Sequence, residues 1–550
     1  MGTSNVNLLW KDFKGIRKLH SINSDTQFGA DIAHNVILSK EKSGENRSIK
    51  SGGWFEPFAT MSEDVIRLFS ANISGYGAPD QLVAFTKTDS AINAWIIYDN
   101  TGNSTPVQIA TFPVASDVTD ACMVQWGDRM VVVVAFGNST LGFIAYSATA
   151  LTGWTQMGTS NFYYRIESIT ETSTHSAITD ITRVKPYRSR LAINGITTYN
   201  ANGAETIYGV WFSEAGNALN FSMDYTTSAT ETSAFFVEVG EYVNQLEVYH
   251  GLTVFSRNRS YNITGTNQND IKVMPLIAKG VFGNATFVID GKCGYVDSWN
   301  HNMFLLRDNI DGTIGFDEAI GDDIEEYLQD VKDVTISVVG NRVRMLKSSG
   351  LSLVFDAEIA EWIEESFVED ARVVAFLNQE YFCNGTEDVY RICDTYGLYA
   401  QQTPNENGYY SHYRTNLMWL DSQSSVKSHI YPFAIILEPT TNNDFFVKFT
   451  TDRGNVYEGR ITKSGFVNVA TYSNSDAVPE DGSQFVNDDE DLSGRVFFNV
   501  SGTELLVTVE RPPYWRYLQI DIYTTSPTQQ FNISGIEAKN TFITDEMLDY

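Results

Sequence analysis

Histidine and cysteine are scarce in this chain of 550 residues, with seven and four copies. The sequence holds no His-Glu-x-x-His pair, no Gly-x-Ser-x-Gly elbow and no phosphate-binding Gly-Lys-Ser/Thr loop. The common zinc-hydrolase, serine-hydrolase and nucleotide-binding mechanisms therefore have no sequence support. The cysteines Cys122, Cys293, Cys383 and Cys393 show no metal-site spacing and are too few for a disulfide scaffold. Cys383 and Cys393 fit either an opposed pair across a hairpin or two buried free thiols, and we favour the thiols.

Basic residues are also few: 38 Lys and Arg stand against 68 Asp and Glu, which gives a net charge of −30. A stable grip on nucleic acid needs clustered cations, so this balance argues against it. It does not exclude a surface that nucleic acid slides past. The alternative is that the charge only maintains solubility.

Long apolar runs are missing as well. No segment approaches the roughly 18 uninterrupted apolar residues of a membrane-spanning helix. The first ten residues contain neither a basic region nor a long apolar run, so we expect no secretory signal. From these absences we expect no enzymatic activity, no cofactor, and no catalytic or metal-binding residues.

The sequence does contain many short strand signals separated by turns. Aromatic residues make up 13% of the chain, which favours strands. Residues 130–136 are an apolar, valine-rich run that predicts a buried strand. Asn194-Gly195 predicts a hairpin turn after the strand 190–193. Further strands are expected at residues 82–85, 94–98, 302–306, 338–345 (with a turn at Gly340-Asn341) and 351–355.

Such spacing predicts an all-β fold. At roughly 40–50 residues per blade, residues 59–408 hold about seven blades of a divergent β-propeller, and we expect six to eight. Residues 1–58 are interpreted as an N-terminal arm with the first strands. One amphipathic helix is expected within residues 318–331, where Ile324 and Leu328 share a face and Asp322 or Asp323 caps the amino end.

Two stretches, residues 207–221 and 246–261, each indicate a strand, a tight turn and a strand. We interpret the first as the edge of one blade turning into the next. Ser213 and Glu214 lie side by side in it, but no histidine is closer in sequence than His175 or His250. A nucleophile with its base is therefore not expected.

Residues 409–550 alternate more cleanly between apolar and polar positions, as in a sheet with one solvated face. A C-terminal β-sandwich is the best prediction for this segment. Its strands are expected at residues 435–438, 445–449, 455–461, 495–500, 505–509 and 517–523.

Three patterns invite a binding role. Residues 307–312 imitate a calcium loop with Asn309, Asp311 and Glu318 as ligands, but Arg307 occupies the first position, so we favour a hairpin turn. The acidic run 487–491 suits either a divalent cation or, more simply, a solvated loop. Tyr514, Trp515 and Tyr517 could form a carbohydrate-binding face, although a place in the core or at a subunit interface is favoured. A carboxylate pair for glycoside hydrolysis depends on spatial separation, which the sequence does not give.

A series of short motifs follows a fixed order along the chain. They lie at residues 13–16, 30–35, 49–54, 190–193, 210–216 with 220–221, 252–261, the short helix near Ile324, 354–356 with Trp362, and 389–392. In order and spacing this series resembles the β-propeller tail proteins of short-tailed bacteriophages, called nozzle, tail hub or packaged-DNA stabilisation proteins. The resemblance covers most of residues 10–400. One departure is the Ser-Gly-Gly at residues 51–53, where that family often has Arg-Pro-Gly.

The resemblance implies a structural protein without catalytic residues. It implies a homo-oligomeric ring, commonly a hexamer, at the distal end of a virion tail that assembles in a host cytoplasm. The channel would retain the genome and conduct it at ejection, with double-stranded DNA passing without specific binding. Other tail proteins, such as adaptors and fibres, would be its partners. The alternatives are a virion receptor-binding or glycan-binding propeller, and an unrecognised glycoside hydrolase or lyase.

Overall fold

The computed structural model describes residues 4–544 with interruptions, the longest at 17–28, 72–79, 166–177, 394–407, 418–426, 474–495 and 510–517. Within the described part, every regular element is a β-strand except the short 3₁₀ segment η3 (Asp322–Leu328). The chain divides into two compact units. One unit, the sandwich unit, combines residues 1–56, 351–367 and 393–550. The other, the propeller unit, combines residues 57–350 and 368–392.

In the propeller unit, antiparallel strands pair in six groups of four and one hairpin of two. The first five groups are β6 (Asp64–Ala71), β7 (Gln81–Lys87), β8 (Ala91–Asp99) and β9 (Val107–Pro113); β10 (Ala121–Trp126), β11 (Met130–Ala135), β12 (Thr140–Ser147) and β13 (Ala150–Gln156); β15 (Val184–Tyr187), β16 (Arg190–Tyr199), β17 (Glu205–Phe212) and β19 (Phe235–Glu238); β20 (Val243–Val248), β21 (Leu252–Ser256), β22 (Ser260–Thr264) and β23 (Lys272–Pro275); and β24 (Val281–Ile289), β25 (Lys292–Asp297), β26 (Met303–Asp308) and β27 (Ile314–Ala319). The sixth group starts with the hairpin of β28 (Thr335–Val339) and β29 (Arg342–Leu346). The seventh contains β32 (Arg372–Phe376), β33 (Gln379–Cys383), β34 (Asp388–Cys393) and β5 (Trp54–Thr60).

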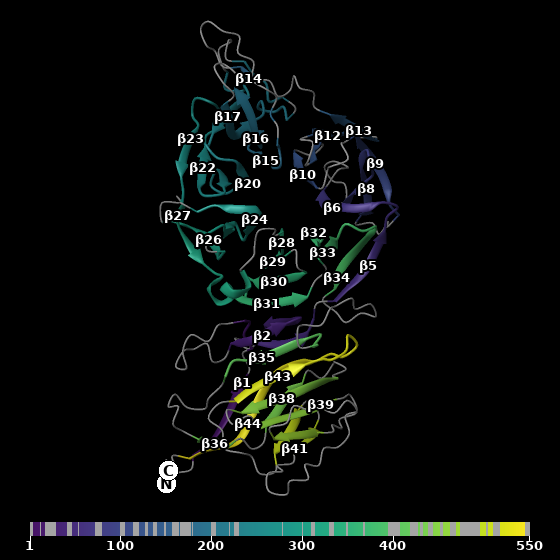
Figure 1. Cartoon of the computed structure of the whole chain (residues 1–550), viewed down its shortest axis with the longest axis vertical. Helices are drawn as coiled ribbons and strands as arrows, with labels where there is room; N and C mark the ends of the chain where they lie inside the picture. The colour runs from purple at the N-terminus through teal and green to yellow at the C-terminus, as the bar shows by residue number, and fades with distance from the viewer. Residues whose placement is uncertain are drawn as a thin grey trace. The chain divides into compact units, whose positions relative to one another are not determined.

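The first strands of these groups form a closed ring. β6, β10, β15, β20, β24, β28 and β32 each contact the next, and β32 contacts β6. Figure 1 shows these strands around a common centre. The described strands therefore form a seven-bladed β-propeller, which confirms the predicted fold. The seventh blade takes its fourth strand, β5, from the opposite end of the unit's sequence, and this exchange closes the ring.

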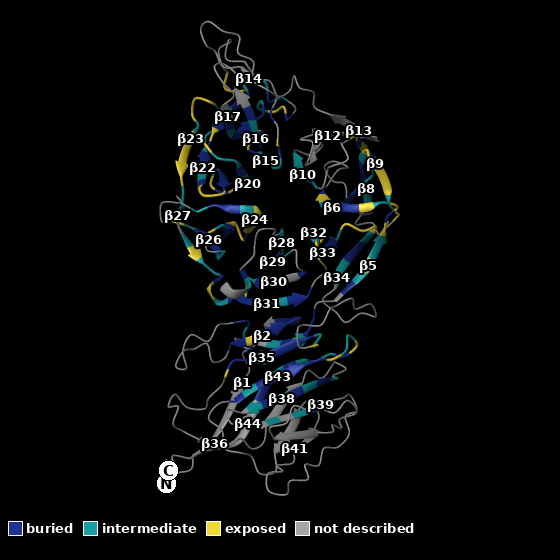
Figure 2. Ribbon diagram, in the orientation of Figure 1, coloured by how far each residue is buried: buried dark blue, intermediate teal, exposed yellow. Residues whose placement is uncertain are grey.

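Apolar side chains fill the space between neighbouring blades. At the closure, Val65 and Leu68 of β6 share a buried cluster with Phe376 and Cys383 of the seventh blade. A second cluster joins the third and fourth blades and includes Phe212. Each such buried side chain contributes roughly 1.5–3 kcal/mol relative to exposure. Burial is nearly complete in the second strands β7 and β21, whereas all four residues of the outer strand β23 are exposed, as Figure 2 shows.

The sandwich unit contains two sheets, which agrees with the predicted β-sandwich. One sheet has the order β3-β4-β44-β37-β42-β41, with β1 and β36 also pairing with β44. The strands of the other follow the order β30-β31-β2-β35-β43-β38-β39-β40. Their bounds are β1 (Ser4–Trp10), β2 (Ala30–His34), β3 (Val36–Lys40), β4 (Arg47–Ser51), β30 (Leu351–Asp356), β31 (Glu361–Ser366), β35 (His412–Thr415), β36 (Lys427–His429), β37 (Phe433–Leu437), β38 (Phe445–Thr451), β39 (Asn455–Ile461), β40 (Val469–Ser473), β41 (Val496–Ser501), β42 (Glu504–Val509), β43 (Leu518–Tyr523) and β44 (Asn532–Thr544).

Asn35 is the point at which the chain changes sheets, between β2 and β3. Its φ of 50° is one that asparagine tolerates better than most residues. Residues 1–58 were interpreted from sequence as an N-terminal arm with the first strands. In the structure, residues 1–56 belong to the same compact unit as residues 351–367 and 393–550.

Two local predictions were wrong. Asn194-Gly195 is not a turn, because β16 pairs with β17 without a break through both residues. The segment after β17 turns within one blade, since β17 and β19 are the third and fourth strands of the same blade. It contains a tight turn at Gly216, with φ 77°.

Other local predictions were confirmed or refined. The valine-rich run forms β11, in the middle of its sheet, and the turn at Gly340 joins β28 to β29. The expected helix is only the 3₁₀ segment η3, with a kink at Ile324. Ile324 and Leu328 are buried, as the spacing predicted.

Candidate functional site

One face of the propeller carries an open pocket. In an antiparallel blade, the turn between the second and third strands lies on the same face as the link into the next blade. Two such segments, residues 239–242 and 257–259, contribute with β17 and the start of β24 to a pocket of ≈ 640 Å³ that spans the third, fourth and fifth blades. It is lined by Tyr208, Gly240, Glu241, Tyr242, Asn244, Arg257, Phe282 and Gly283.

Tyr242 is held in place by its hydroxyl. That oxygen donates to the Asp180 carbonyl at 2.9 Å and lies 2.9 Å from the Thr182 hydroxyl. The side-chain amide of Asn194, a residue that the sequence predicted to lie in a turn, donates to the same oxygen at 3.3 Å. Burial raises the pKa of Tyr242, so its ring enters the pocket wall as a neutral phenol.

Arg257 and Phe282 form a second fixed pair. The guanidinium carbon lies 5.5 Å from the centre of the Phe282 ring, a favourable cation–π geometry. The Ser298 hydroxyl donates to the Arg257 carbonyl at 2.6 Å, and His301 packs edge-on against Phe282. The same turn presents Trp299, whose exposed fraction of 67% is the highest among the large exposed apolar residues that the structure describes.

Polar groups complete the wall. Glu241 accepts a hydrogen bond from Asn258 at 3.3 Å and lies 3.9 Å from Arg259. Asn244 donates to the Val281 carbonyl at 2.7 Å. The pocket lining contains a single carboxylate and no histidine or cysteine, so the wall suits binding rather than acid–base or nucleophilic chemistry.

Charged pairs inside the propeller join blades to one another. Lys185 of β15 lies 2.9 Å from Glu247 of β20, which also accepts from Thr286 of β24 at 2.8 Å. Burial alone would lower the pKa of Lys185, but Glu247 raises it overall. Arg67 of β6 and Arg372 of β32 both contact Asp120, at 2.9 and 3.3 Å.

The sandwich unit has its own polar and aromatic face. His412 and Arg414 both contact one oxygen of Asp521, at 2.7 and 2.6 Å. Tyr523 stacks between Tyr409 and Phe446, with ring centres at 4.0 and 5.3 Å. These contacts fix neighbouring strands to one another.

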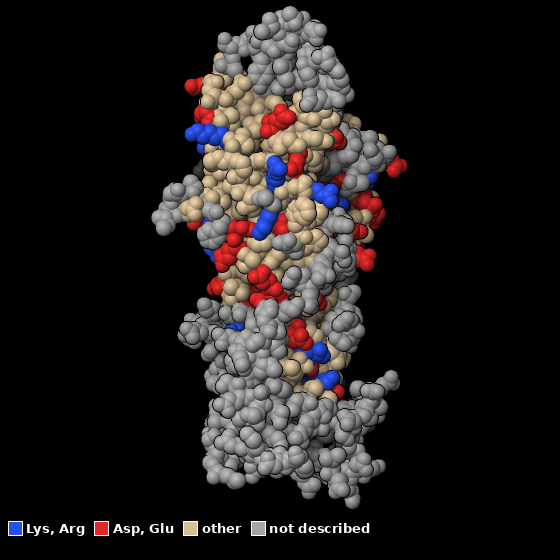
Figure 3. All heavy atoms as spheres, turned by 60° about the vertical axis from the view of Figure 1, so that its left-hand side comes forward, with Lys and Arg blue, Asp and Glu red and all other residues tan. Residues whose placement is uncertain are grey.

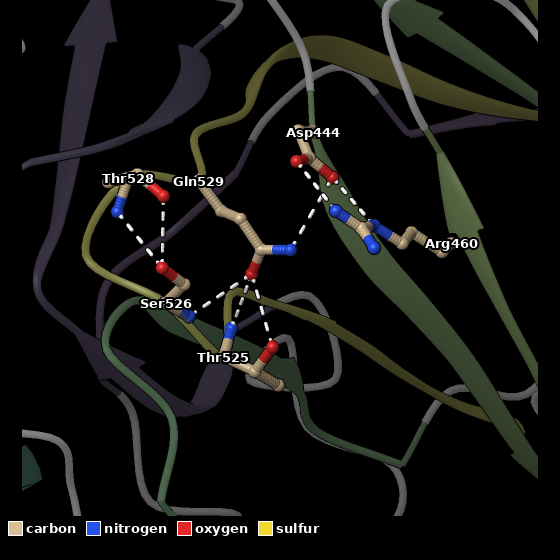
Figure 4. A network of polar contacts seen from close by, with 6 residues as sticks. All are labelled: Asp444, Arg460, Thr525, Ser526, Thr528 and Gln529. Atoms are coloured by element: carbon tan, nitrogen blue, oxygen red, sulfur yellow. Dashed lines mark hydrogen bonds and ion pairs between the residues drawn. The ribbon is translucent and has the colours of Figure 1, made fainter. Parts of the chain in front are cut away.

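The stack ends in a turn network, shown in Figure 4. Arg460 forms a two-point pair with Asp444, with both contacts at 2.9 Å. Asp444 in turn accepts from Gln529 at 3.4 Å. Gln529 folds the turn that precedes β44 by accepting from the backbone N–H groups of Thr525 and Ser526.

Several residues singled out in the sequence have structural roles. Ser213 is fully buried; its hydroxyl accepts from the Leu191 N–H and donates to the Glu214 carbonyl. Arg307 pairs with Glu318 across the β26–β27 hairpin. These two residues are the ends of the sequence that resembles a calcium loop, and they pair with each other. No group of three or more His, Cys, Asp or Glu among the described residues is arranged to hold a metal ion.

Cys383 faces Val389 across the β33–β34 hairpin, so it does not oppose Cys393. It is a buried free thiol whose pKa burial raises to about 12. The acidic run 487–491, the Asp311-Gly312 turn and the aromatic residues Tyr514, Trp515 and Tyr517 lie outside the described residues.

Sequence reasoning did not find the pocket, because its walls come from β17, the link into β20, the β21–β22 turn and the start of β24. The sequence signals were the stretch 207–221, which contains Tyr208, and the motif at residues 252–261, which contains Arg257. Figure 3 shows one side of the molecule, on which acidic side chains are scattered among uncharged ones and basic side chains occur in small groups. In the described residues no helix has the length and hydropathy that a bilayer crossing requires.

No family model matches the chain, and no curated protein matches its sequence. Among solved structures, Sqt1 of Saccharomyces cerevisiae is similar at a TM-score of 0.36 and 12% identity, over 77% of this chain and 100% of that chain. BamB of Moraxella catarrhalis is similar at 0.34 and 9% identity, over 71% and 97% of the two chains. BBS1N, solved in complex with ARL6DN, is similar at 0.34 and 12% identity, over 63% and 98%. Similarity at this level carries no argument about function, and the propeller itself follows from the strand order.

Proposed function

We propose that this chain is a structural component of a bacteriophage tail, a nozzle or hub subunit that assembles into a homo-oligomeric ring. A hexamer is the favoured stoichiometry. The observation that carries the proposal is the ordered series of motifs between Phe13 and Ile392. That series resembles the propeller tail proteins of short-tailed phages.

The positions of the motif residues support a structural role, because motifs distant in sequence contact one another. Ile16 of the first motif donates its N–H to the carbonyl of Trp362, a late motif residue, at 2.8 Å. Arg190 donates to the carbonyl of Ser213, in the next motif, at 2.6 Å. The Gly52 N–H donates to the Asn35 carbonyl at 3.0 Å. These contacts connect distant parts of the chain and help to hold the fold together.

The charge balance is consistent with a genome channel. A ring of chains that each carry a net charge of −30 offers little for phosphate to bind, so friction on passing double-stranded DNA is low. In this proposal the ring retains the genome until ejection and contacts adaptor and fibre proteins. Its place is the tail of a virion assembled in the host cytoplasm.

Mass photometry of the purified chain, with and without its adaptor protein, tests the proposal. Six copies of 61.5 kDa predict a particle of about 370 kDa. A closed ring in either condition is the expected result. A strict monomer in both conditions would overturn the proposed ring. A gel shift that showed stable DNA binding at physiological salt would contradict the proposal that DNA passes through the ring without being bound.

A further inference from the structure

We propose that the pocket shared by the third, fourth and fifth blades is a binding site for a neutral oligosaccharide. The inference stands on the pocket lining alone and does not require the ring assembly. It concerns the propeller, not the aromatic residues of the sandwich segment.

The lining has an unusual composition for a hydrophobic site. Its eight residues include three aromatic rings but no Leu, Ile, Val or Met. A hydrocarbon or lipid chain would find no aliphatic wall here. Sugar rings present C–H faces that pack on aromatic rings, and Tyr208, Tyr242 and Phe282 offer such surfaces.

Polar groups suited to hydroxyls stand beside these rings. Glu241 can only accept hydrogen bonds when ionised, Arg257 can only donate, and the Asn244 amide can do both. Sugar hydroxyls donate and accept, so they match a mixed set of this kind. Glu241 and Asn244 keep hydrogen-bonding capacity beyond their contacts with Asn258 and the Val281 carbonyl. An aliphatic or aromatic peptide side chain would leave that remaining capacity unused when it excluded water, at a cost of up to about 1–3 kcal/mol for each group.

Charge favours a neutral ligand. Arg257 is the pocket's single cation and Glu241 its single carboxylate, so the lining residues carry no net charge. Around them the chain has a net charge of −30. A sulfated or phosphorylated chain would meet this acidic field with only Arg257 in the lining and Arg259 beside Glu241 to attract it, whereas polyanion binding requires a larger cluster of cations.

The walls are set before a ligand arrives. The Tyr242 hydroxyl is fixed to Asp180 and Thr182, and the Arg257 backbone is held by the Ser298 hydroxyl. Gly240 and Gly283 adopt positive φ values of 74° and 46° and add no side chain to the space. Preorganised walls reduce the entropy lost on binding. The volume of ≈ 640 Å³ lies within the roughly 300–1,000 Å³ range of small-ligand sites.

The test uses the full chain on a microarray of neutral oligosaccharides built from hexoses, 6-deoxyhexoses and N-acetylhexosamines. Sulfated and sialylated oligosaccharides and proline-rich peptides share the array, and saturation-transfer NMR confirms each hit. Three variants are compared: Phe282→Leu keeps apolar bulk but removes the ring, Glu241→Gln removes the carboxylate, and Glu238→Gln changes an exposed acid on β19 as the control. Unchanged thermal unfolding midpoints show that the variants are folded.

We expect a neutral oligosaccharide to bind the unaltered chain and the control equally. Binding should weaken about 3–10-fold in Phe282→Leu and about 10-fold or more in Glu241→Gln. Retention of only charged glycans or only peptides would overturn the ligand class. Binding that neither pocket variant changes would overturn the site, and the absence of any retained oligosaccharide would overturn the whole proposal.

Discussion

Arg344 of β29 and Glu380 of β33 form a buried two-point ion pair that joins the sixth and seventh blades. Nε and Nη2 of Arg344 donate to the two oxygens of Glu380 at 2.9 and 2.8 Å. Only 3% and 11% of the two side chains are exposed. Burial alone would raise the pKa of Glu380, but the guanidinium outweighs it and lowers that pKa below its usual value.

Arg344→Met should therefore destabilise the propeller unit by about 3–5 kcal/mol, because it leaves an unpaired buried carboxylate. The double change Arg344→Met with Glu380→Leu should recover most of that loss. Urea unfolding measures the effect, with hydrogen exchange in β29 and β33 to locate it and Lys292→Met, at an exposed position, as the control. If the double change were as harmful as the single one, the loss would come from packing and not from the unpaired charge.

Arg190→Lys should also destabilise the propeller, although it keeps the positive charge. The Arg190 guanidinium donates to the backbone carbonyls of Glu231, Ser213, Ser233 and Thr266 at 2.6–2.9 Å. A lysine ammonium lacks the planar fork needed to reach them together, so we expect a loss of about 3 kcal/mol. The exposed Arg188→Lys is the matched control. Thermal unfolding and proteolysis near residues 230–235 report the effect; equal stability of both variants would contradict it.

The sequence predicted the strands better than their partners. The continuous valine run of β11 and the period-two alternation in β38, β39 and β43 are local patterns, and they placed these strands almost correctly. Asn194-Gly195 failed because Asn194 satisfies the backbone of Thr182 and Arg183, a tertiary contact that overrides turn propensity. The pairing of β5 with the seventh blade depends on ring closure, which no local pattern encodes. The pocket was missed for the same reason.

The sandwich unit should lose stability on mild acidification because of His412. Burial lowers the pKa of His412 despite the opposing effect of Asp521. An unfolded histidine titrates near pH 6.5, so below that pH the unfolded chain binds the proton first, and stability falls as pH falls toward the lower folded pKa. Burial tends to raise the pKa of Asp521, but His412 and Arg414 lower it overall. The contribution of Asp521 is therefore lost only at more acidic pH.

His412→Gln places an N–H donor near the position of Nε2, which contacts Asp521, and removes the titration. Between pH 7 and 5 the urea midpoint of the sandwich unit should fall less in this variant than in the unaltered chain. His250→Asn, at an exposed histidine of the propeller unit, is the control and should leave the slope unchanged. An identical pH slope in His412→Gln would show that the acid sensitivity does not come from His412.

Gly15→Ala should disrupt the sandwich unit. A Cβ at Gly15 would lie 2.2 Å from the carbonyl oxygen of Trp362 and 2.8 Å from its nitrogen, so the backbone of β31 would have to move. Overpacking against backbone costs about 3 kcal/mol or more. Gly216→Asn is the control, because Gly216 has φ 77° and open space around its Cβ position, and asparagine tolerates that conformation. Urea unfolding followed by tryptophan fluorescence should show an early transition only in Gly15→Ala. Equal transitions in the two variants would mean that residues 13–16 do not fix β31.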